Sequence, residues 1–454
     1  MEKPTEEMMM EIDESNVKRT NEVPEDDIVI KKAKVNVFST ELLRVYYARL
    51  FPHDQMFQWL SYGADREASS DFFFRREFSF TIENDVYIRY LSFRNLEEMR
   101  KAILLKQPHK IDIGPVYSSP PKDHNMVKAT SFKPLERELV FDIDLTDYDE
   151  VRTGCTPDLM WERQSWLYMS VAIKIVDQSL REDFGFKHML WVFSGRRGVH
   201  CWVCDPRARA LDDKGRTSVV NYLTLISGNE NSSNRVALSS PMHPAVERAM
   251  PHMHTVFEEM VLPESGQGLL ADEERWTRVL NHVPNEEIRE RLSTAWLADA
   301  TGNSVKRWKQ LSATVRDAAT KKKEPEASKL RACINSIIIL HTYPRLDVNV
   351  STHRNHLLKS PFVIHPKTGK VCVPIFDVDN SHKFDPDNVP TLPSLVKEID
   401  AIQEGDSDQP EYGMTSMKQY IDGFQNLFLK PLMKTIKSQE LEAKRKADGA
   451  NGDW

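Results

Sequence analysis

The residues best suited to chemistry are two aspartates in the stretch from Phe141 to Asp149, which reads FDIDLTDYD. Apolar and acidic residues alternate at its start, which is the period of a strand with one buried face. Asp142 and Asp144 therefore share a face, where their charges repel each other unless a cation lies between them. Oxygen ligands suit a hard divalent ion such as Mg²⁺ or Mn²⁺. A bare D-x-D motif also fits an exposed edge strand with two surface acids, so the rest of the chain must decide between these interpretations.

A basic turn between two apolar runs is the second chemically suited stretch. The runs HMLWVF and VHCWVCD flank the sequence SGRRG. Glycine permits positive φ and close backbone approach, and arginine presents forked donors that suit phosphates. Ser194, Arg196, Arg197 and His200 therefore concentrate donors for a polyphosphate at one hairpin tip. The alternative is an exposed tip that its arginines keep soluble.

Further candidate residues lie farther along the chain. Asp347 falls in the alternating run RLDVNV, which predicts a third carboxylate on a strand beside the first pair. Lys359 and His365 follow it, and the composition of HPKTGK predicts a hairpin turn. Arg89 lies in the second strand of an earlier hairpin, where it either reaches the sheet rim or meets a phosphate.

Together these residues describe one site. The three acids would hold two divalent ions that clamp the attacking and leaving oxygens of a phosphoryl displacement. The arginines, the lysine and the histidines would bind a triphosphate and its developing charge. That chemistry is nucleotidyl transfer from a nucleoside triphosphate, since a nuclease has less use for a triphosphate cradle.

Composition restricts the class of protein. Of the 454 residues, 40% are hydrophobic and 28% are charged, as in an ordinary globular protein. The net charge of −7 argues against coating nucleic acid by bulk charge, so a polyanion must meet a local basic groove. We expect a reducing compartment and no membrane partner, because neither a signal-peptide core nor a span of ~20 apolar residues is present. Cys201 and Cys204 lack further ligands at zinc spacing and are expected to be buried strand residues.

Hydrophobic periodicity divides the chain into five segments. Strands and helices mix in two of them, helical patterns dominate a third, and the two ends are rich in polar residues. The predicted segments are a disordered acidic arm at 1–36, the first part of a mixed core at 37–207, an all-helical subdomain at 208–340, the second part of the core at 341–405, and a C-terminal helix with a disordered tail at 406–454.

The chain resembles the small, catalytic subunits of eukaryotic DNA primases, within the archaeo-eukaryotic primase superfamily. The resemblance extends in family order from about residue 40 to 375 and is carried by YYARLFP, REFSFTIENDVYIRY, KIDIG, ELVFDIDLTDYD, FGFKHMLWVFSGRRGVHCWVCD, PRLDVNVS and NHLLKSPFVIHPKTG. It implies an α+β fold, in which a primase catalytic core with an RRM-like β-sheet is flanked by helices and interrupted by the helical subdomain. It also implies synthesis of short RNA primers on single-stranded DNA from ribonucleoside triphosphates, for the initiation of DNA replication.

The resemblance implies roles for individual residues of this sequence. The Mg²⁺ or Mn²⁺ ligands would be Asp142, Asp144 and Asp347, and Glu77 in REFSF would be a further catalytic acid. Asp112 would lie by the ribose of the incoming nucleotide. The other residues around that nucleotide would be Arg89, Ser194, Arg196, Arg197, His200, Lys359 and His365.

The resemblance also implies partners. These are a primase large subunit with an iron–sulfur cluster, which forms a heterodimer with this chain, and the catalytic and accessory subunits of DNA polymerase α. The nucleic acids would be a single-stranded DNA template and an RNA primer, and the location would be the nucleus.

The sequence departs from the family after the acidic strand, where the family usually carries a structural zinc site of paired cysteines and a CxxC. Here the stretch is VRTGCTPDLMWERQSWLYM, with Cys155 alone. One thiolate cannot hold tetrahedral Zn²⁺, so we predict that no structural zinc is bound. Packing of Met160, Trp161 and Trp166 would take over its role.

Two other functions compete with replicative priming. One is a primase-like repair or translesion polymerase that adds deoxynucleotides, and the other is a non-catalytic scaffold that retains the fold. The helical insertion favours the replicative subunit over the first. The three intact acids argue against the second, because a scaffold has no reason to tolerate their repulsion.

Overall fold

The computed structural model describes residues 38–63, 70–152, 165–227, 235–236, 238, 241–299, 301–402 and 410–450. The acidic arm at 1–36 lies outside these residues, as do Cys155, Met160 and Trp161. The predictions of a disordered arm and of a missing zinc site therefore stay predictions. Trp166 is described, and its indole Nε1 donates to the carbonyl of Ser381 at 2.7 Å.

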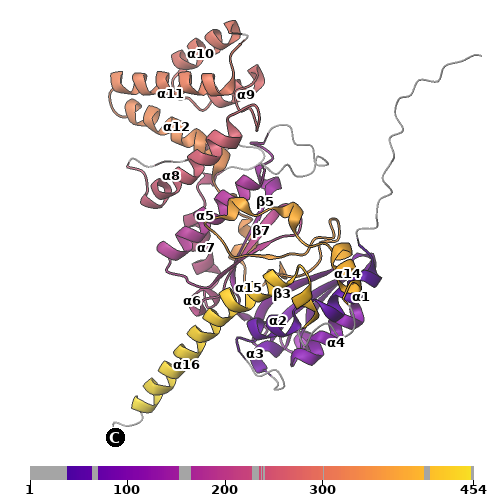
Figure 1. Cartoon of the computed structure of the whole chain (residues 1–454). Helices are drawn as coiled ribbons and strands as arrows, with labels where there is room; N and C mark the ends of the chain where they lie inside the picture. The colour runs from indigo at the N-terminus through magenta and orange to yellow at the C-terminus, as the bar shows by residue number, and fades with distance from the viewer. Residues whose placement is uncertain are drawn as a thin grey trace, which may run out of the picture. The chain divides into compact units, whose positions relative to one another are not determined.

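The strands form two main antiparallel sheets (Figure 1). The first sheet has the order β10-β3-β1-β2, with β4 paired to β3. Its strands are β1 (Arg76–Ile82), β2 (Val86–Leu91), β3 (Lys110–Tyr117), β4 (Pro134–Glu136) and β10 (Leu358–Lys359). The second sheet has the order β11-β6-β7-β5. Its strands are β5 (Leu139–Asp144), β6 (Met189–Phe193), β7 (Gly198–Val203) and β11 (Pro374–Ile375).

Helices precede and follow these strands, which confirms the α+β class. Side-chain caps start several of them: Ser39 Oγ accepts from the Leu42 N–H at 3.2 Å, and Asn95 Oδ1 accepts from the Glu98 N–H at 3.0 Å. The helices of the core are α1 (Thr40–Arg49), α2 (His53–Leu60), α3 (Asp71–Phe74), α4 (Leu96–Lys106), α5 (Trp166–Glu182), α6 (Pro206–Arg209), α13 (Val348–Thr352) and α14 (Leu392–Asp400).

The segment predicted to be helical consists mainly of helices. They are α7 (Asp213–Leu223), α8 (Pro244–Val256), α9 (Glu273–Leu280), α10 (Glu286–Ala298), α11 (Ser304–Lys321) and α12 (Glu326–Thr342). A two-stranded pair of β8 (Ile226–Ser227) and β9 (Arg235–Val236) also occurs there. At the C-terminal end, α15 (Lys418–Gly423) is followed by a π-helix, η9 (Phe424–Leu429), and by α16 (Lys430–Ala450). Among the described helices, none is long and apolar enough to cross a membrane.

The predicted hairpins form. Between β1 and β2, Asn84 and Asp85 have φ of 62° and 56°, a conformation that short polar side chains tolerate best after glycine. Between β6 and β7, the Ser194 N–H donates to Gly198 O at 2.9 Å. The turn after His365 closes through its N–H, which donates to Lys370 O at 2.8 Å.

Asp347 does not lie on a strand, so that prediction was wrong. It is the N-cap of α13, and its carboxylate accepts from the Asn349 N–H at 3.0 Å. A capping aspartate satisfies a helix N–H that has no partner in the first turn, and burial of Val350 supports the turn. These contacts outweigh the β propensity of the run VNV, which is a weak preference. Asp347 nevertheless reaches β5, because its own N–H donates to Asp142 O at 3.0 Å.

A buried ion pair joins the two sheets. Glu138 immediately precedes β5, and Arg76 opens β1; their side chains are 0% and 1% exposed. Two parallel hydrogen bonds of 3.0 Å connect the guanidinium to the carboxylate. The Tyr62 hydroxyl also donates to Glu138, at 2.5 Å. Burial by itself would raise the pKa of Glu138, but the charge and hydrogen bonds of Arg76 prevail and lower it to about 2.

Candidate active site

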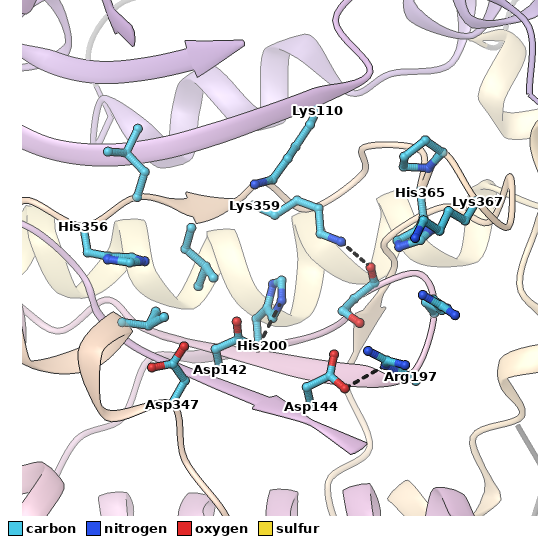
Figure 2. Close-up of a pocket in the computed structure, with 16 residues that line it drawn as sticks. Lys110, Asp142, Asp144, Arg197, His200, Asp347, His356, Lys359, His365 and Lys367 are labelled. Carbon is cyan, nitrogen blue, oxygen red and sulfur yellow. Dashed lines mark hydrogen bonds and ion pairs between the residues drawn. The ribbon is translucent and has the colours of Figure 1, made fainter. Parts of the chain in front are cut away.

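The two aspartates of β5 face the same side of the second sheet, as their alternation predicts. Antiparallel pairing places Asp142 opposite His200 and Asp144 opposite Gly198. The Asp142 carboxylate lies 3.5 Å from His200 Nε2, and 29% of the Asp142 side chain is exposed. Figure 2 shows both carboxylates pointing from the strand into one space, with Asp347 beside them.

Asp144 is held by its own loop and by the basic turn. Its Oδ1 accepts from the Thr146 N–H at 2.8 Å and from the Thr146 hydroxyl at 2.7 Å. Arg197 Nε donates to the same oxygen at 2.8 Å (Figure 2). The turn between β6 and β7 is thereby attached to the acidic strand.

A cavity of about 460 Å³ collects acidic and basic side chains from distant segments. Its acids come from β5 and from the start of α13. Its bases come from β3, from β7 and the β6–β7 turn, and from β10 with the residues on either side of it (Figure 2). The residues that line it are Lys110, Asp142, Asp144, Ser194, Arg196, Arg197, His200, Asp347, Val350, His356, Leu357, Leu358, Lys359, His365, Pro366 and Lys367.

Hydrogen bonds join the basic turn to β10 and to the segment after it. Lys359 Nζ donates to Ser194 O at 2.6 Å, and the Thr368 hydroxyl donates to Gly195 O at 2.7 Å. Gly195 has φ of +88°, and a Cβ added to it would lie 2.6 Å from His365 Cβ. Only glycine satisfies both constraints, so this position requires the residue that the sequence supplies.

Burial and neighbouring charges shift the pKa values of three residues that line the cavity. Burial, and then the charges of Asp144 and Asp347, raise the pKa of Asp142 to about 7. Burial also lowers the pKa of His200 well below its ordinary value, and Lys359 adds to this effect. The pKa of His365 falls to about 3 through burial and the neighbouring cations, of which Lys359 contributes most. Both histidines are therefore neutral at pH 7.

The structure brings nine of the twelve predicted site residues to the cavity. These are the three aspartates, Ser194, Arg196, Arg197, His200, Lys359 and His365. The remaining three, Glu77, Arg89 and Asp112, do not line it, and their roles stay predictions.

The three residues outside the cavity are engaged with neighbours. Glu77 is fully buried, and Arg89 donates to its two carboxylate oxygens at 2.9 and 3.2 Å. Asp112 is 3% exposed, and it accepts from the Ser79 hydroxyl at 3.0 Å and pairs with Lys110 at 3.1 Å. Asp112 thus lies behind the cavity, next to two of its lining residues: Lys110, and Lys359, which is its partner across β3 and β10.

Three further polar residues, to which the sequence pattern assigned no individual role, line the cavity: Lys110, His356 and Lys367. Two short sequence relations could have identified them. Lys110 shares a strand face with Asp112, and His356 and Lys367 lie in the same stretch as Lys359 and His365.

The donor set of the three aspartates fits a hard divalent cation. All three supply carboxylate oxygens. Burial, and after it the charges of Asp144 and Asp347, raise the pKa of Asp142, and a bound cation would offset this repulsion. Among the described residues, no three His, Cys, Asp or Glu side chains are gathered tightly enough to hold an ion as they stand. The three carboxylates share the cavity without closing around one point.

Comparison with known proteins shows the family of this chain. The family model described as DNA primase small subunit matches residues 141–376, which include the three aspartates, both basic segments and all of the second sheet except the first two residues of β5. Proteins named DNA primase small subunit are similar over most of their length. The one from Schizosaccharomyces pombe is 38% identical over 88% of this chain and 86% of its own. The one from Drosophila melanogaster is 40% identical over 93% and 98%, and the one from Saccharomyces cerevisiae is 34% identical over 86% and 92%.

The fold and the site define a nucleotidyltransferase of the primase type. The chain belongs to the DNA primase small subunit family. Among solved structures, the polymerase domain of Mycobacterium tuberculosis ligase D in complex with DNA covers 85% of this chain at 10% identity, with a TM-score of 0.36, which is too low to support a conclusion.

Proposed function

We propose that this chain catalyses DNA-templated synthesis of RNA primers by nucleotidyl transfer in the described cavity. One observation carries the proposal: three carboxylates and five lysine or arginine side chains line the same cavity. The carboxylates suit divalent ions, and the cations suit the triphosphate of a ribonucleotide.

Asp142, Asp144 and Asp347 would hold two divalent ions. When bound, Mg²⁺ or Mn²⁺ supplies charge that activates the attacking hydroxyl and stabilises the leaving pyrophosphate. Glu77 would support this centre from its buried position rather than bind an ion, because both its oxygens accept from Arg89.

The basic residues of the chain would bind and orient the triphosphate. Lys359 and Arg196 both line the cavity. His365 is neutral, and its buried Nδ1 has no partner among the described residues. A neutral imidazole can donate to a phosphate oxygen without adding charge. Lys359 also fixes the turn through Ser194 O, so one side chain joins the two basic segments that contact the phosphates.

The proposal extends to partners and location. The small subunits to which this chain is similar are named as parts of primase, which supports a heterodimer with a large subunit and association with DNA polymerase α. Their eukaryotic sources support a nuclear location. The four described cysteines are free and buried, as suits a reducing compartment. Template, primer and ribonucleotides would meet at the cavity.

Ribonucleotide incorporation tests the proposal. The assay uses the whole chain, alone and with a primase large subunit, on poly-pyrimidine single-stranded DNA with Mg²⁺ or Mn²⁺. We expect extension of a supplied RNA primer, and loss of at least 100-fold in Asp142→Ala and Asp144→Ala, since both would be metal ligands. Asp317→Ala, which removes an exposed acid of α11, serves as the control.

The alternative functions give different outcomes. Preference for deoxynucleotides would indicate a repair or translesion polymerase. Incorporation that both cavity variants retain would refute the metal assignment, and a folded wild-type chain inactive in both preparations would indicate a scaffold.

A further inference from the structure

Arg137 lies two residues before β5, and its guanidinium is buried against α13, the short helix that Asp347 caps. Its Nη1 donates to Val350 O at 3.0 Å and to His353 O at 2.9 Å. Both carbonyls belong to the C-terminal end of α13, where helix carbonyls lack partners within the helix. Arg137 thus holds one end of α13, and Asp347 occupies the other.

Two more contacts attach this segment to strands, one to β5 and one to β4 of the first sheet. The Asp347 N–H donates to Asp142 O at 3.0 Å, and Arg354 Nη1 donates to Leu135 O at 3.0 Å. In the sequence, Arg137 lies between the two acceptors of these contacts, at 135 and 142. The two carbonyls that it binds belong to residues between the two donors, at 347 and 354. The three ties therefore fix both the position and the direction of α13 along the acidic strand.

Arg137 is itself held in place. Its backbone N–H donates to Arg209 O at 3.2 Å. Arg216, a fully buried side chain of α7, donates to the carbonyl of Arg137 and, at 3.0 Å, to Glu138 O. The main chain from which the guanidinium extends therefore cannot shift freely.

Burying the positive charge of Arg137 destabilises the fold, because the charge loses its hydration. The side chain is 1% exposed, and no carboxylate among the described residues forms an ion pair with it. Its Nε and Nη2 have no acceptor in the described part of the chain, and burial, followed by the charge of Arg216, lowers its pKa to about 9. An apolar side chain of similar volume would pack here at less cost. The contacts to α13 are what the guanidinium contributes.

We infer that Arg137 is a positioning residue for nucleotidyl transfer: by gripping the far end of α13, it keeps the Asp347 carboxylate beside Asp142 and Asp144. The inference rests on the proposed function, since it concerns the same metal site. Arg137 does not line the cavity and would not touch metal, nucleotide or template. Partners that orient a metal ligand typically contribute about 10- to 100-fold to metal affinity.

Direct Mn²⁺ binding, measured by calorimetry on the full chain without nucleotide, tests the inference. Arg137→Met keeps an unbranched apolar stem and removes the guanidinium donors. Arg307→Met is the matched control, because Arg307 is 5% exposed and its Nη1 also donates to two carbonyls, those of Leu270 and Ala271 at 2.7 and 2.9 Å. Asp347→Asn provides the reference for loss of a ligand.

We expect Arg137→Met to weaken Mn²⁺ binding by about 10- to 100-fold and Arg307→Met to change it less than twofold. Arg137→Lys keeps the charge without the guanidinium geometry, and its loss should be intermediate. Equal weakening in Arg307→Met, or wild-type binding in Arg137→Met, would overturn the inference. If the methionine variant does not fold, wild-type affinity in Arg137→Lys would overturn it.

The Asp347→Asn variant distinguishes failure of the proposed metal site from failure of the role of Arg137. A wild-type chain that binds no Mn²⁺ refutes the metal site and with it the role of Arg137. Binding that Asp347→Asn loses and Arg137→Met retains refutes the role of Arg137 alone.

Discussion

Replacing Glu138 by Gln should destabilise the fold strongly, because it leaves the Arg76 guanidinium buried without its counter-charge. Glutamine keeps the shape of the side chain, but the remaining acceptors of Arg76 are then the carbonyls of Leu60 and Gly114 and one amide oxygen. Removing one partner of a buried ion pair costs about 3–5 kcal/mol. The pKa of Glu138 gives an independent figure: a fall from 4.5 to about 2 corresponds to roughly 3 kcal/mol.

Both figures predict a loss of about 3–5 kcal/mol in the free energy of unfolding of Glu138→Gln. Urea denaturation measures this loss, with Glu411→Gln as the control. Glu411 accepts two hydrogen bonds of 2.7 Å from Arg49, the same bidentate geometry, but its side chain is 40% exposed. An exposed pair of this kind contributes about 0–1 kcal/mol. The double variant Arg76→Met with Glu138→Leu should be more stable than Glu138→Gln, because it removes both charges.

The pH dependence follows with a definite sign. A carboxylate whose folded pKa is depressed stabilises the protein above its ordinary pKa of 4.5, and this contribution is lost as the pH falls toward 2. The difference in stability between wild type and Glu138→Gln should therefore shrink below pH 4.5. A Glu138→Gln cost no larger than that of Glu411→Gln would refute the reasoning.

Three further outcomes concern the cavity. Burial and the neighbouring acids hold the pKa of Asp142 at about 7, so below that pH a metal ion must displace a proton from this carboxyl group. The Mn²⁺ affinity measured by calorimetry should therefore fall about tenfold from pH 8 to pH 6. An affinity independent of pH would contradict this prediction. Lys359→Met should raise the KM for nucleotide by about 10- to 100-fold, more than it lowers kcat, since a charged hydrogen-bond donor is lost; an unchanged KM would exclude a phosphate contact. Gly195→Ala should weaken nucleotide binding and lower the melting temperature together, because its Cβ would lie 2.6 Å from His365 Cβ; a variant with wild-type values of both would show that the turn adapts.

The acids of β5 and the basic turn could be predicted because their order is local. Strict alternation places Asp142 and Asp144 on one face, and pairing of β5 with β7 then brings them beside His200. Gly195 marks the positive φ that it adopts, and Gly198 marks the close approach of Ile143 O, which would lie 2.6 Å from an added Cβ. At both places the geometry expected from the local sequence pattern is the geometry found in the fold.

Two features could not be predicted from local patterns. Asp347 caps a helix that begins with the sequence VNV, in which the two valines favour a strand. The helix forms because Asp347 caps it and because Val350 is buried. Arg89 should share a face with Tyr87 and Leu91, but β2 carries an extra residue opposite β1, and Tyr90 has φ of 59°. Such a bulge interrupts the two-residue period, and Arg89 pairs with Glu77 instead.

The segment from β10 to β11 has a consequence for the order in which the protein can fold. β10 lies at the edge of the first sheet, and β11 lies at the edge of the second, although both come from residues 358–375. A chain still emerging from the ribosome therefore lacks the outer strand of both sheets at once, together with the lysine that joins them to the turn. Unpaired strand edges invite association with other chains, and contacts between distant residues form slowly. Nascent chains that stop before this segment should thus need protection from aggregation, because this one segment supplies the outer strand of both sheets and several residues that line the cavity.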